Sequence, residues 1–329
     1  MGALSAHVHG AGLVARQEVR VRLRTGRWKV LLGVWAVVVN GLGLLFRISL
    51  ENDAGGERHQ GVPMFGGVLL AVLALCLLIT PALTGQSVNG DRERGTLAAL
   101  QITRLSPLDI ALGKLLAAWG AGLLVLALTL PCVLFPVVEG AITVGRAAAV
   151  LAVTALLIGV VCALSQAWSA LVARSITSVL LSYLTVLALF GGTPLAFALA
   201  LPLTSEPRYY SGETGVRYAY SRERPERIWW LLAPNPVVVL ADAAPRLPER
   251  REVLYGDEIV RDSASDPLGD LGRSVREVRA GDDRDEDEVG PVWPYGLAFD
   301  VLLAAGAFWI TTRRLRTPVH TMPKGVRLA

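Results

Sequence analysis

The sequence predicts an all-α polytopic membrane protein with six transmembrane helices, both termini in the cytoplasm, and a large exterior loop between helices 5 and 6. Three observations lead to this prediction. Hydrophobic residues make up 53% of the 329 residues, and charged residues only 18%. The apolar residues gather into runs of roughly twenty, enough for a helix to cross about 30 Å of hydrocarbon. Basic residues are also distributed unevenly between the loops.

The first region, residues 1–27, is the predicted cytoplasmic N-terminus. Residues 1–12 are small and polar, and we expect them to be disordered. In residues 13–29 arginines recur at three- and four-residue spacing, which predicts a basic amphipathic helix lying against anionic headgroups. A plain basic flank of the first span is equally compatible, and both interpretations place the region in the cytoplasm. The long apolar run that follows argues against a cleaved signal peptide.

The second region, residues 28–202, contains five predicted spans. They cover residues 28–46, 64–84, 112–138, 147–167 and 176–201. Pro131 and Pro136 lie near the far end of the third span, where we expect them to kink or end the helix, because proline lacks the backbone donor and clashes with the preceding turn. The sixth span, 293–312, belongs to the last region, residues 291–329, which ends in a basic tail.

The orientation follows from the lysines and arginines in the short loops. With the N-terminus inside, the cytoplasmic segments hold sixteen of them: six in 1–29, four in 86–119, one at Arg174 and five in the tail. The short exterior segments hold three, Arg47, Arg58 and Arg146. This asymmetry predicts six spans in the cell membrane with both termini cytoplasmic.

The segment 203–290 is then extracytoplasmic. It holds thirteen arginines and nineteen acidic residues, a net charge of −6. Residues 227–245 are apolar and aromatic but are broken by Pro234 and Pro236, which predicts a short interfacial or re-entrant element; the packed core of a small exterior subdomain is the alternative. Residues 246–290 predict a solvated, flexible acidic linker, with a cation site as the minor option.

Signatures of catalysis and of cofactor binding are missing from the sequence. None of the four histidines lies in H-E-x-x-H, and no G-x-S-x-G elbow occurs. Gly113 and Lys114 are followed by leucine, so they do not form a P-loop. Cys76, Cys132 and Cys162 lie in apolar runs and are expected to be buried apolar side chains. We therefore expect no enzyme activity, cofactor or metal in this chain, and any ATP hydrolysis on a separate subunit.

Asp300 lies well inside the sixth span, an expensive position for a carboxylate unless it faces protein or water. It could line a transport path or pair with a polar group of another span. It could equally be protonated, or lie close enough to the outer surface to be hydrated. These alternatives remain open at the level of sequence.

A polar island, residues 86–119, separates the second and third spans. It begins with a charge cluster from Asp91 to Arg94 and the turn pair Gly95 and Thr96. Leu97 and Leu100 stand at i and i+3 spacing in a short helix expected over residues 96–103, and Arg94 and Arg104 flank this apolar edge. Such an edge suits a knob that docks into a groove of a soluble partner.

The second half of the island predicts a well-capped helix. Ser106 can cap its start, Pro107 suits the first helical position, and Asp109 lies near the positive end of the helix dipole. We expect Lys114 to mark the membrane entry of the third span by snorkelling. From these residues alone, a docking segment and an ordinary loop are equally compatible.

The island resembles the cytoplasmic loop of ABC-2 type transporter permeases. A glutamate followed by Gly-Thr-Leu, a second leucine, a Ser-Pro step and a Gly-Lys pair carry the resemblance. The matching positions are Glu93, Gly95, Thr96, Leu97, Leu100, Ser106, Pro107, Gly113 and Lys114. The six spans and the basic N-terminal helix fit the family more loosely, and the long 203–290 segment departs from it.

The resemblance implies that the loop 86–114 carries a coupling helix that contacts a nucleotide-binding subunit. The implied contact residues are the matching positions together with Arg94 and Arg104. We therefore expect the permease subunit of an ATP-driven exporter, working with an ABC ATPase and a second permease copy or paralogue, and without a nucleic-acid partner. The spans show no charged substrate pocket, which favours a lipid-like or amphipathic cargo. A membrane anchor or signalling protein that keeps the permease fold without transport is the alternative.

Overall fold

The protein is described by a computed structural model that covers residues 3–24, 26–53, 61–101, 105–211, 217–247, 253–255, 258–260, 266–281 and 289–316. It is mostly helical over these residues. Six helical stretches are long and apolar enough to cross a membrane. They run Trp28–Ser49, Gly61–Glu93, Pro107–Ala127, Val144–Leu171, Ser175–Thr204 and Trp293–Leu315. The prediction of six helices that are long and apolar enough to span a membrane is therefore confirmed.

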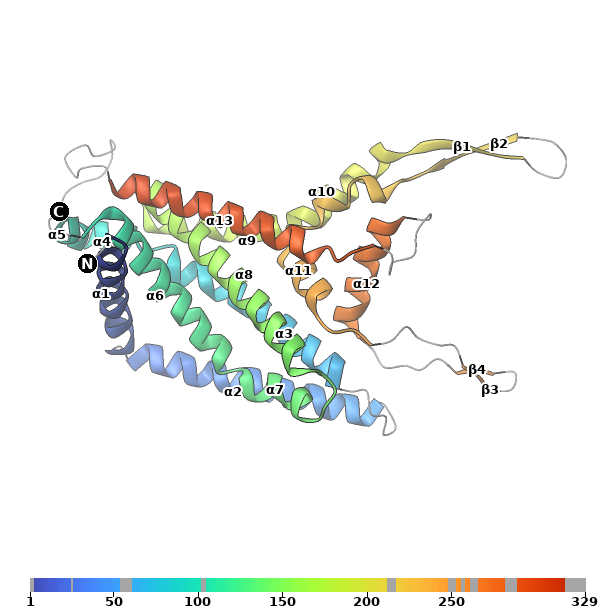
Figure 1. The fold of residues 1–329 in the computed structure, drawn as a ribbon, viewed down its shortest axis with the longest axis horizontal. Helices are drawn as coiled ribbons and strands as arrows, with labels where there is room; N and C mark the ends of the chain where they lie inside the picture. Colours follow the sequence, from blue (N-terminus) through green and yellow to red (C-terminus); the bar gives the residue numbers. More distant parts are fainter. Residues whose placement is uncertain are drawn as a thin grey trace.

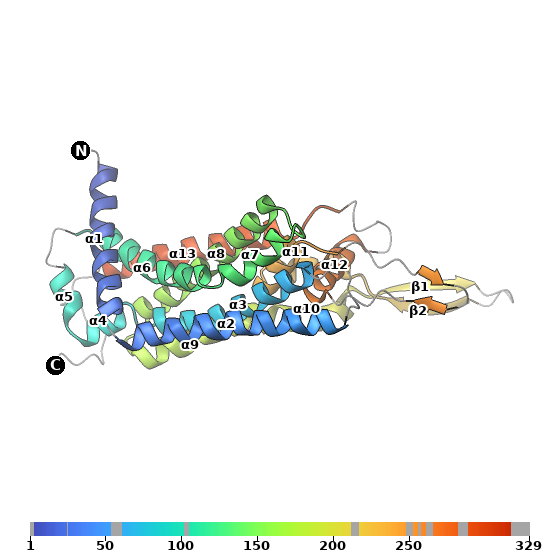
Figure 2. The same cartoon turned by 90° about the horizontal axis from the view of Figure 1, so that it is seen from below.

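The N-terminus is more ordered than expected. Helix α1 (Ala3–Arg24) includes most of the residues expected to be disordered, and α2 (Gly26–Asp53) begins two residues after it. The expectation of disorder was wrong because Ala11 and Val14 are buried against the third span, where small residues allow close packing. Helix α1 stands roughly crosswise to α2 at one end of the molecule (Figure 2).

The second and third spans enclose the polar island. Helix α3 (Gly61–Thr84) is followed by two short helices, α4 (Asn89–Glu93) and α5 (Thr96–Gln101). The third span then splits into α6 (Pro107–Ala127) and α7 (Leu130–Val138). The break lies just before Pro131, as the loss of a backbone donor at proline predicts.

Helix α8 (Val144–Leu171) is the centre of the bundle. It packs against α13 (Trp293–Leu315), α3, α6 and α9 (Ser175–Leu187). Most of its inward residues are buried, and with α3 it supplies much of the main hydrophobic core. The three cysteines are buried, as their apolar surroundings predict.

The fifth span is the least buried of the six. It consists of α9, a π-helical turn η1 (Ala188–Gly192), α10 (Thr193–Ala200) and a 3-10 turn η2 (Leu201–Thr204). Its most apolar window contains no buried residue, and in α9 only Ser175, Ser178 and Ser182 are buried. A helix that presents so many exposed leucines is suited to lipid or to another protein, since the described residues of the chain cover it only in part.

Beyond the fifth span the chain forms an antiparallel hairpin, β1 (Glu206–Ser211) and β2 (Arg217–Arg222), in which Glu206 pairs with Arg222. Two 3-10 turns, η3 (Pro225–Arg227) and η4 (Trp229–Leu231), lead into α11 (Pro236–Ala243). The element expected over 227–245 is thus divided into short pieces, and α11 is buried against α8, α12 and α13. Val239, Leu240 and Ala241 of α11 belong to the main hydrophobic core.

The linker prediction for 246–290 was wrong for residues 266–281. They form α12 (Pro267–Ala280), an amphipathic helix capped by Asp266. Leu268 and Val275 are buried against α11 and the main core. The helical spacing of the apolar residues therefore allows the segment to pack as an ordered helix despite its high charge. A second small hairpin, β3 (Val253–Tyr255) and β4 (Glu258–Val260), precedes α12. The sequence GDDRDEDE falls at 281–288, where only Gly281 is described.

The molecule is elongated, and its two ends differ (Figure 1). Helices α1, α4 and α5 lie at one end, together with the end of α13. The two hairpins and α12 lie at the other end. The polar island and the described parts of both termini therefore share one side of the bundle, as the loop charges predict.

Candidate functional site

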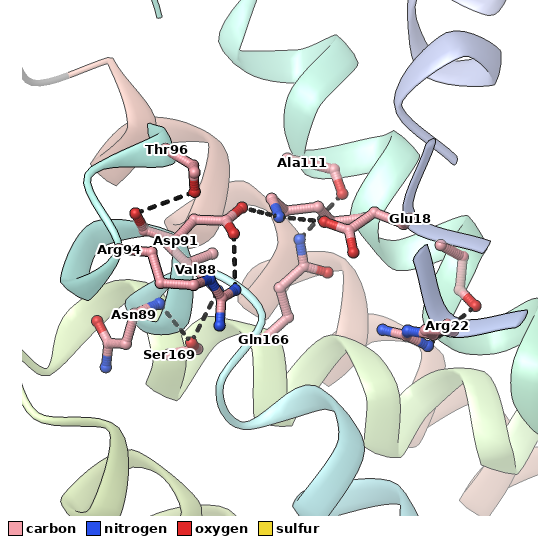
Figure 3. Close-up of polar contacts among 12 residues, drawn as sticks. Glu18, Arg22, Val88, Asn89, Asp91, Arg94, Thr96, Ala111, Gln166 and Ser169 are labelled. Atoms are coloured by element: carbon pink, nitrogen blue, oxygen red, sulfur yellow. Dashed lines mark hydrogen bonds and ion pairs between the residues drawn. The ribbon is translucent and has the colours of Figure 1, made fainter. Parts of the chain in front are cut away.

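The polar island forms a compact junction at the end of the bundle. Helix α4 lies beside α6, where α1 and α8 also come together (Figure 3). Four charged side chains mark its centre: Glu18, Asp91, Arg94 and Lys114. We call these four residues the charge junction.

Lys114 is the buried member of the charge junction. Its side chain is 1% exposed, although the sequence suggested that it would snorkel to the membrane surface. Its ammonium instead forms an ion pair with Glu18 of α1, with Nζ 2.5 Å from Oε1, and a second ion pair with Asp91 of α4. A buried ammonium requires such partners because desolvation of an unpaired charge is costly. Lys114 thereby connects the third span to both α1 and α4.

Asp91 organises the turn that follows the second span. Its carboxylate also accepts a hydrogen bond from Arg94, with Nη2 2.9 Å from Oδ1. Its backbone carbonyl accepts a bond of 3.2 Å from the Thr96 hydroxyl. Gly95 between them has φ of 70°, a conformation that glycine adopts readily. The charge junction contains two cations and two carboxylates, so its net charge is zero. Charges that are partly buried need such pairing.

Helix α4 is also anchored to the fourth and fifth spans. The Ser169 hydroxyl of α8 accepts bonds from the backbone amides of Val88 and Asn89, at 3.0 and 3.1 Å, at the start of α4. At its other end, the Glu93 carboxylate accepts bonds from the backbone amide and hydroxyl of Ser175, at 3.1 and 2.7 Å. Glu93 thus satisfies an amide at the start of α9, where helices have unpaired donors.

The apolar edge of α5 faces inward. Leu97 is 6% exposed and packs in a cluster with Val88, Ile110 and Leu315, and Leu100 packs against the same cluster. Leu97 is therefore not the projecting knob that its spacing suggested, because the chain's own core occupies that edge. The turn at residues 93–96 is exposed. Arg104 lies outside the described residues.

The start of α6 has the predicted cap. The Ser106 hydroxyl accepts a bond from the Asp109 amide at 3.2 Å, and the Asp109 carboxylate accepts one from the Ser106 amide at 2.9 Å. Pro107 occupies the first turn. His7 of α1 adds a contact that the sequence did not suggest, with Nδ1 2.7 Å from Asp109 Oδ1.

Gly113 explains how α1 comes so close to α6. A β-carbon at this position would lie 2.5 Å from Val14 Cβ and 2.7 Å from the Ala11 carbonyl. The two helices can therefore pack at this depth only with glycine here. Gly113 and Lys114 together make one contact surface, in which the glycine admits α1 and the lysine pairs with Glu18.

Every described residue predicted for the island lies at this junction. Sequence reasoning missed Glu18, Ser169 and Ser175, whose partners are roughly eighty to a hundred residues away in the chain. No local spacing rule connects positions so far apart. The only signal was a lone acid in an otherwise basic helix at Glu18.

The junction links α4 to neighbouring helices through ion pairs and hydrogen bonds. In the described part of the chain, no three histidine, cysteine or acidic side chains gather as a metal site. Asp300, the other predicted site residue, lies away from the junction, in α13, and is 1% exposed. It lines a small cavity where α3, α8, α9, η1 and α11 meet.

The chain matches a protein family over about half of its length. Residues 46–207 match the family model described as ABC-2 family transporter protein. The match includes spans two to five and the island, whereas α1 and α13 lie outside it. No curated protein matches the sequence.

Proposed function

Because this chain belongs to the ABC-2 family of transporter proteins, we propose that it is the permease subunit of an ATP-driven exporter, coupled to a separate ATPase subunit through residues 86–114. The partner ATPase would bind and hydrolyse ATP on the cytoplasmic side of the cell membrane. Both termini would face that side, and a second permease copy or paralogue would complete the path. The cargo we propose is a lipid-like or amphipathic compound.

One observation carries the proposal. The turn at residues 93–96 is exposed at the end of the bundle, yet the residues around it are bonded to three other helices and, through Lys114, to a fourth. Asp91 connects it to α6 through Lys114, and Lys114 connects in turn to α1 through Glu18. Ser169 holds α4 to α8, and Glu93 holds it to α9. A partner that pushes on the turn would move the ends of several spans together.

The inward position of Leu97 changes how the partner would bind. The apolar edge of α5 would stabilise the island internally and make it stiff enough to transmit motion. The partner would then contact the polar outer edge, residues Glu93, Arg94, Gly95 and Thr96. Contact through charged and polar groups suits a complex whose parts must move during each cycle, because such groups favour specificity and fast association.

The test uses the chain purified from its native membranes with any bound ATPase and reconstituted in vesicles. Arg94→Glu reverses the charge of the exposed turn. We expect it to reduce ATPase co-purification and ATP-dependent export of a fluorescent amphipath by about tenfold, as for loss of an interface charge pair worth about 1.4 kcal/mol. Arg146→Glu, an exposed site at the other end of α8, is the matched control and should preserve both.

Two results would contradict the proposal. The first is an Arg94→Glu variant that keeps full ATPase binding and export. The second is a chain that purifies from its native membranes without any ATPase although it is still folded, with the same unfolding temperature before and after purification. That result would favour the non-transporting anchor.

A further inference from the structure

Asp300 is a buried carboxylate in the sixth span. It is 1% exposed, and its Oδ1 has no hydrogen-bond partner among the described residues. A carboxylate at such a depth is costly unless it has a partner, and polar residues inside spans commonly belong to substrate or ion sites. The rest of α13 around it does not supply such a partner, because the neighbouring Ala304 and Ala307 belong to an apolar cluster.

The cavity that Asp300 lines is otherwise apolar. Its walls come from α3, α8, α9, η1 and α11, and include Leu77, Val161, Leu189 and Pro236. Its volume is only about 10 Å³, so a ligand group can enter it only if wall side chains move. The η1 wall is π-helical, an irregularity that is frequent at functional sites. Asn235 holds this turn, since its Nδ2 donates to the Phe190 carbonyl at 2.8 Å and to the Thr193 hydroxyl at 2.9 Å.

A larger apolar groove lies next to this cavity, between α3 and α9. It has a volume of about 440 Å³, and it shares the walls Leu77 and Val186 with the cavity. Its lining is almost wholly aliphatic or aromatic, and the Tyr183 hydroxyl is already bonded to the Leu78 carbonyl at 2.8 Å. Ala74 lies in the groove wall. The groove has room for an alkyl chain, and its two shared wall residues also line the cavity of the buried Asp300 carboxylate.

We propose that the groove and the Asp300 cavity together bind a lipophilic cation. Its apolar body would lie in the groove between α3 and α9, and its amine would pair with the Asp300 carboxylate after Leu77 and Val186 move aside. An anionic amphipath would be repelled, and a neutral one would gain nothing from Asp300. This inference rests on the proposed transport function and narrows the cargo to cationic amphipaths.

The experiment measures binding to the purified chain in phosphatidylcholine nanodiscs, without ATPase, after subtraction of binding to empty nanodiscs. The probes are radiolabelled dodecylamine, dodecanol and dodecanoate, which share one chain length and differ in charge. We expect dodecylamine to bind saturably and more tightly than the other two. Asp300→Asn should weaken dodecylamine by about tenfold or more, as for loss of one partner of a buried charge pair. Asp300→Glu should keep most of the binding.

Two controls separate the site from general effects of charge and folding. Glu139→Gln removes one carboxylate from the exposed end of α7 and should leave dodecylamine binding unchanged. Ala74→Phe fills the groove and should weaken dodecylamine more than butylamine. Unchanged dodecylamine binding in Asp300→Asn would overturn the proposal, as would equal losses of dodecylamine and dodecanol. If Asp300→Asn does not fold, unchanged binding in Ala74→Phe overturns it. Because no ATPase is present, these results are independent of the coupling function.

Discussion

Replacing Lys114 by methionine tests the charge junction directly. Methionine keeps the length of the side chain and most of its apolar surface, so it removes the ammonium with little change in packing. The substitution leaves Asp91 and Glu18 close together without their shared cation. Their side chains are 13% and 27% exposed, so both carboxylates lose their counter-charge in a partly desolvated place.

The magnitude follows from this burial. Removing one partner of a fully buried ion pair costs about 3–5 kcal/mol. Glu18 can turn toward water, and Asp91 keeps Arg94, whose exposed guanidinium contributes about 1 kcal/mol at most. We therefore expect Lys114→Met to lower the free energy of unfolding by about 3 kcal/mol, at the low end of that range. Adding Asp91→Asn should restore about half of this loss, because the second variant removes an uncompensated carboxylate.

The assay is equilibrium unfolding in mixed micelles, followed by tryptophan fluorescence. Glu18→Gln provides a comparison and should cost less than Lys114→Met, since Asp91 still pairs with the lysine. A loss below about 1 kcal/mol for Lys114→Met, in the range of an exposed pair, would refute the claim that the junction is buried and coupled. A double variant that is less stable than the single one would refute it equally.

Two further substitutions, each with a control, test the packing around the site and a buried carboxylate at the other end of the molecule. Gly113→Ala should destabilise the chain by about 1–3 kcal/mol, as overpacking does, and should increase proteolysis of α1. In the same helix Gly120→Ala, where an added β-carbon meets nothing within 4 Å, should be neutral or stabilising by about 0.5–1 kcal/mol. Equal effects at both glycines would contradict the close approach of α1. At the other end, Asp242 is fully buried between Arg246 and Arg276, and it accepts bonds from two amides at the start of α13. Asp242→Asn should cost about 3–5 kcal/mol by urea-gradient or micelle unfolding, whereas Asp270→Asn, with a side chain 46% exposed, should cost about 1 kcal/mol or less.

The six spans could be predicted from sequence because a membrane imposes one strong requirement, a long apolar run, on each of them. The start of α6 could be predicted for a different reason. A capping box is a local device, and Ser106 and Asp109 are only three residues apart. In both cases the information lies within a single stretch of chain.

The rest depended on contacts between distant residues. Lys114 is a lysine near the start of an apolar span, where snorkelling is the usual expectation. Only the fold places Glu18 and Asp91 beside it. The i and i+3 spacing of Leu97 and Leu100 suggested an exposed apolar edge. In the fold, Leu315, more than two hundred residues away in the chain, helps to cover Leu97. Helix α12 was missed because the high charge of residues 246–290 indicated a linker. The apolar residues that pack α12 on α11 are a minority in the segment.

One measurement tests the central claim, that the exposed turn of the island receives the input of an ATPase. A photoreactive benzoylphenylalanine is introduced at Thr96, or at Thr143 before α8, in the chain expressed in its native membranes. Both positions are exposed, and they lie at opposite ends of the bundle. Cross-linked proteins are then identified by mass spectrometry. The account predicts that a P-loop ATPase is captured from position 96 and not from position 143. Capture of the ATPase from position 143 alone, or from neither position while it still co-purifies with the chain, would contradict it.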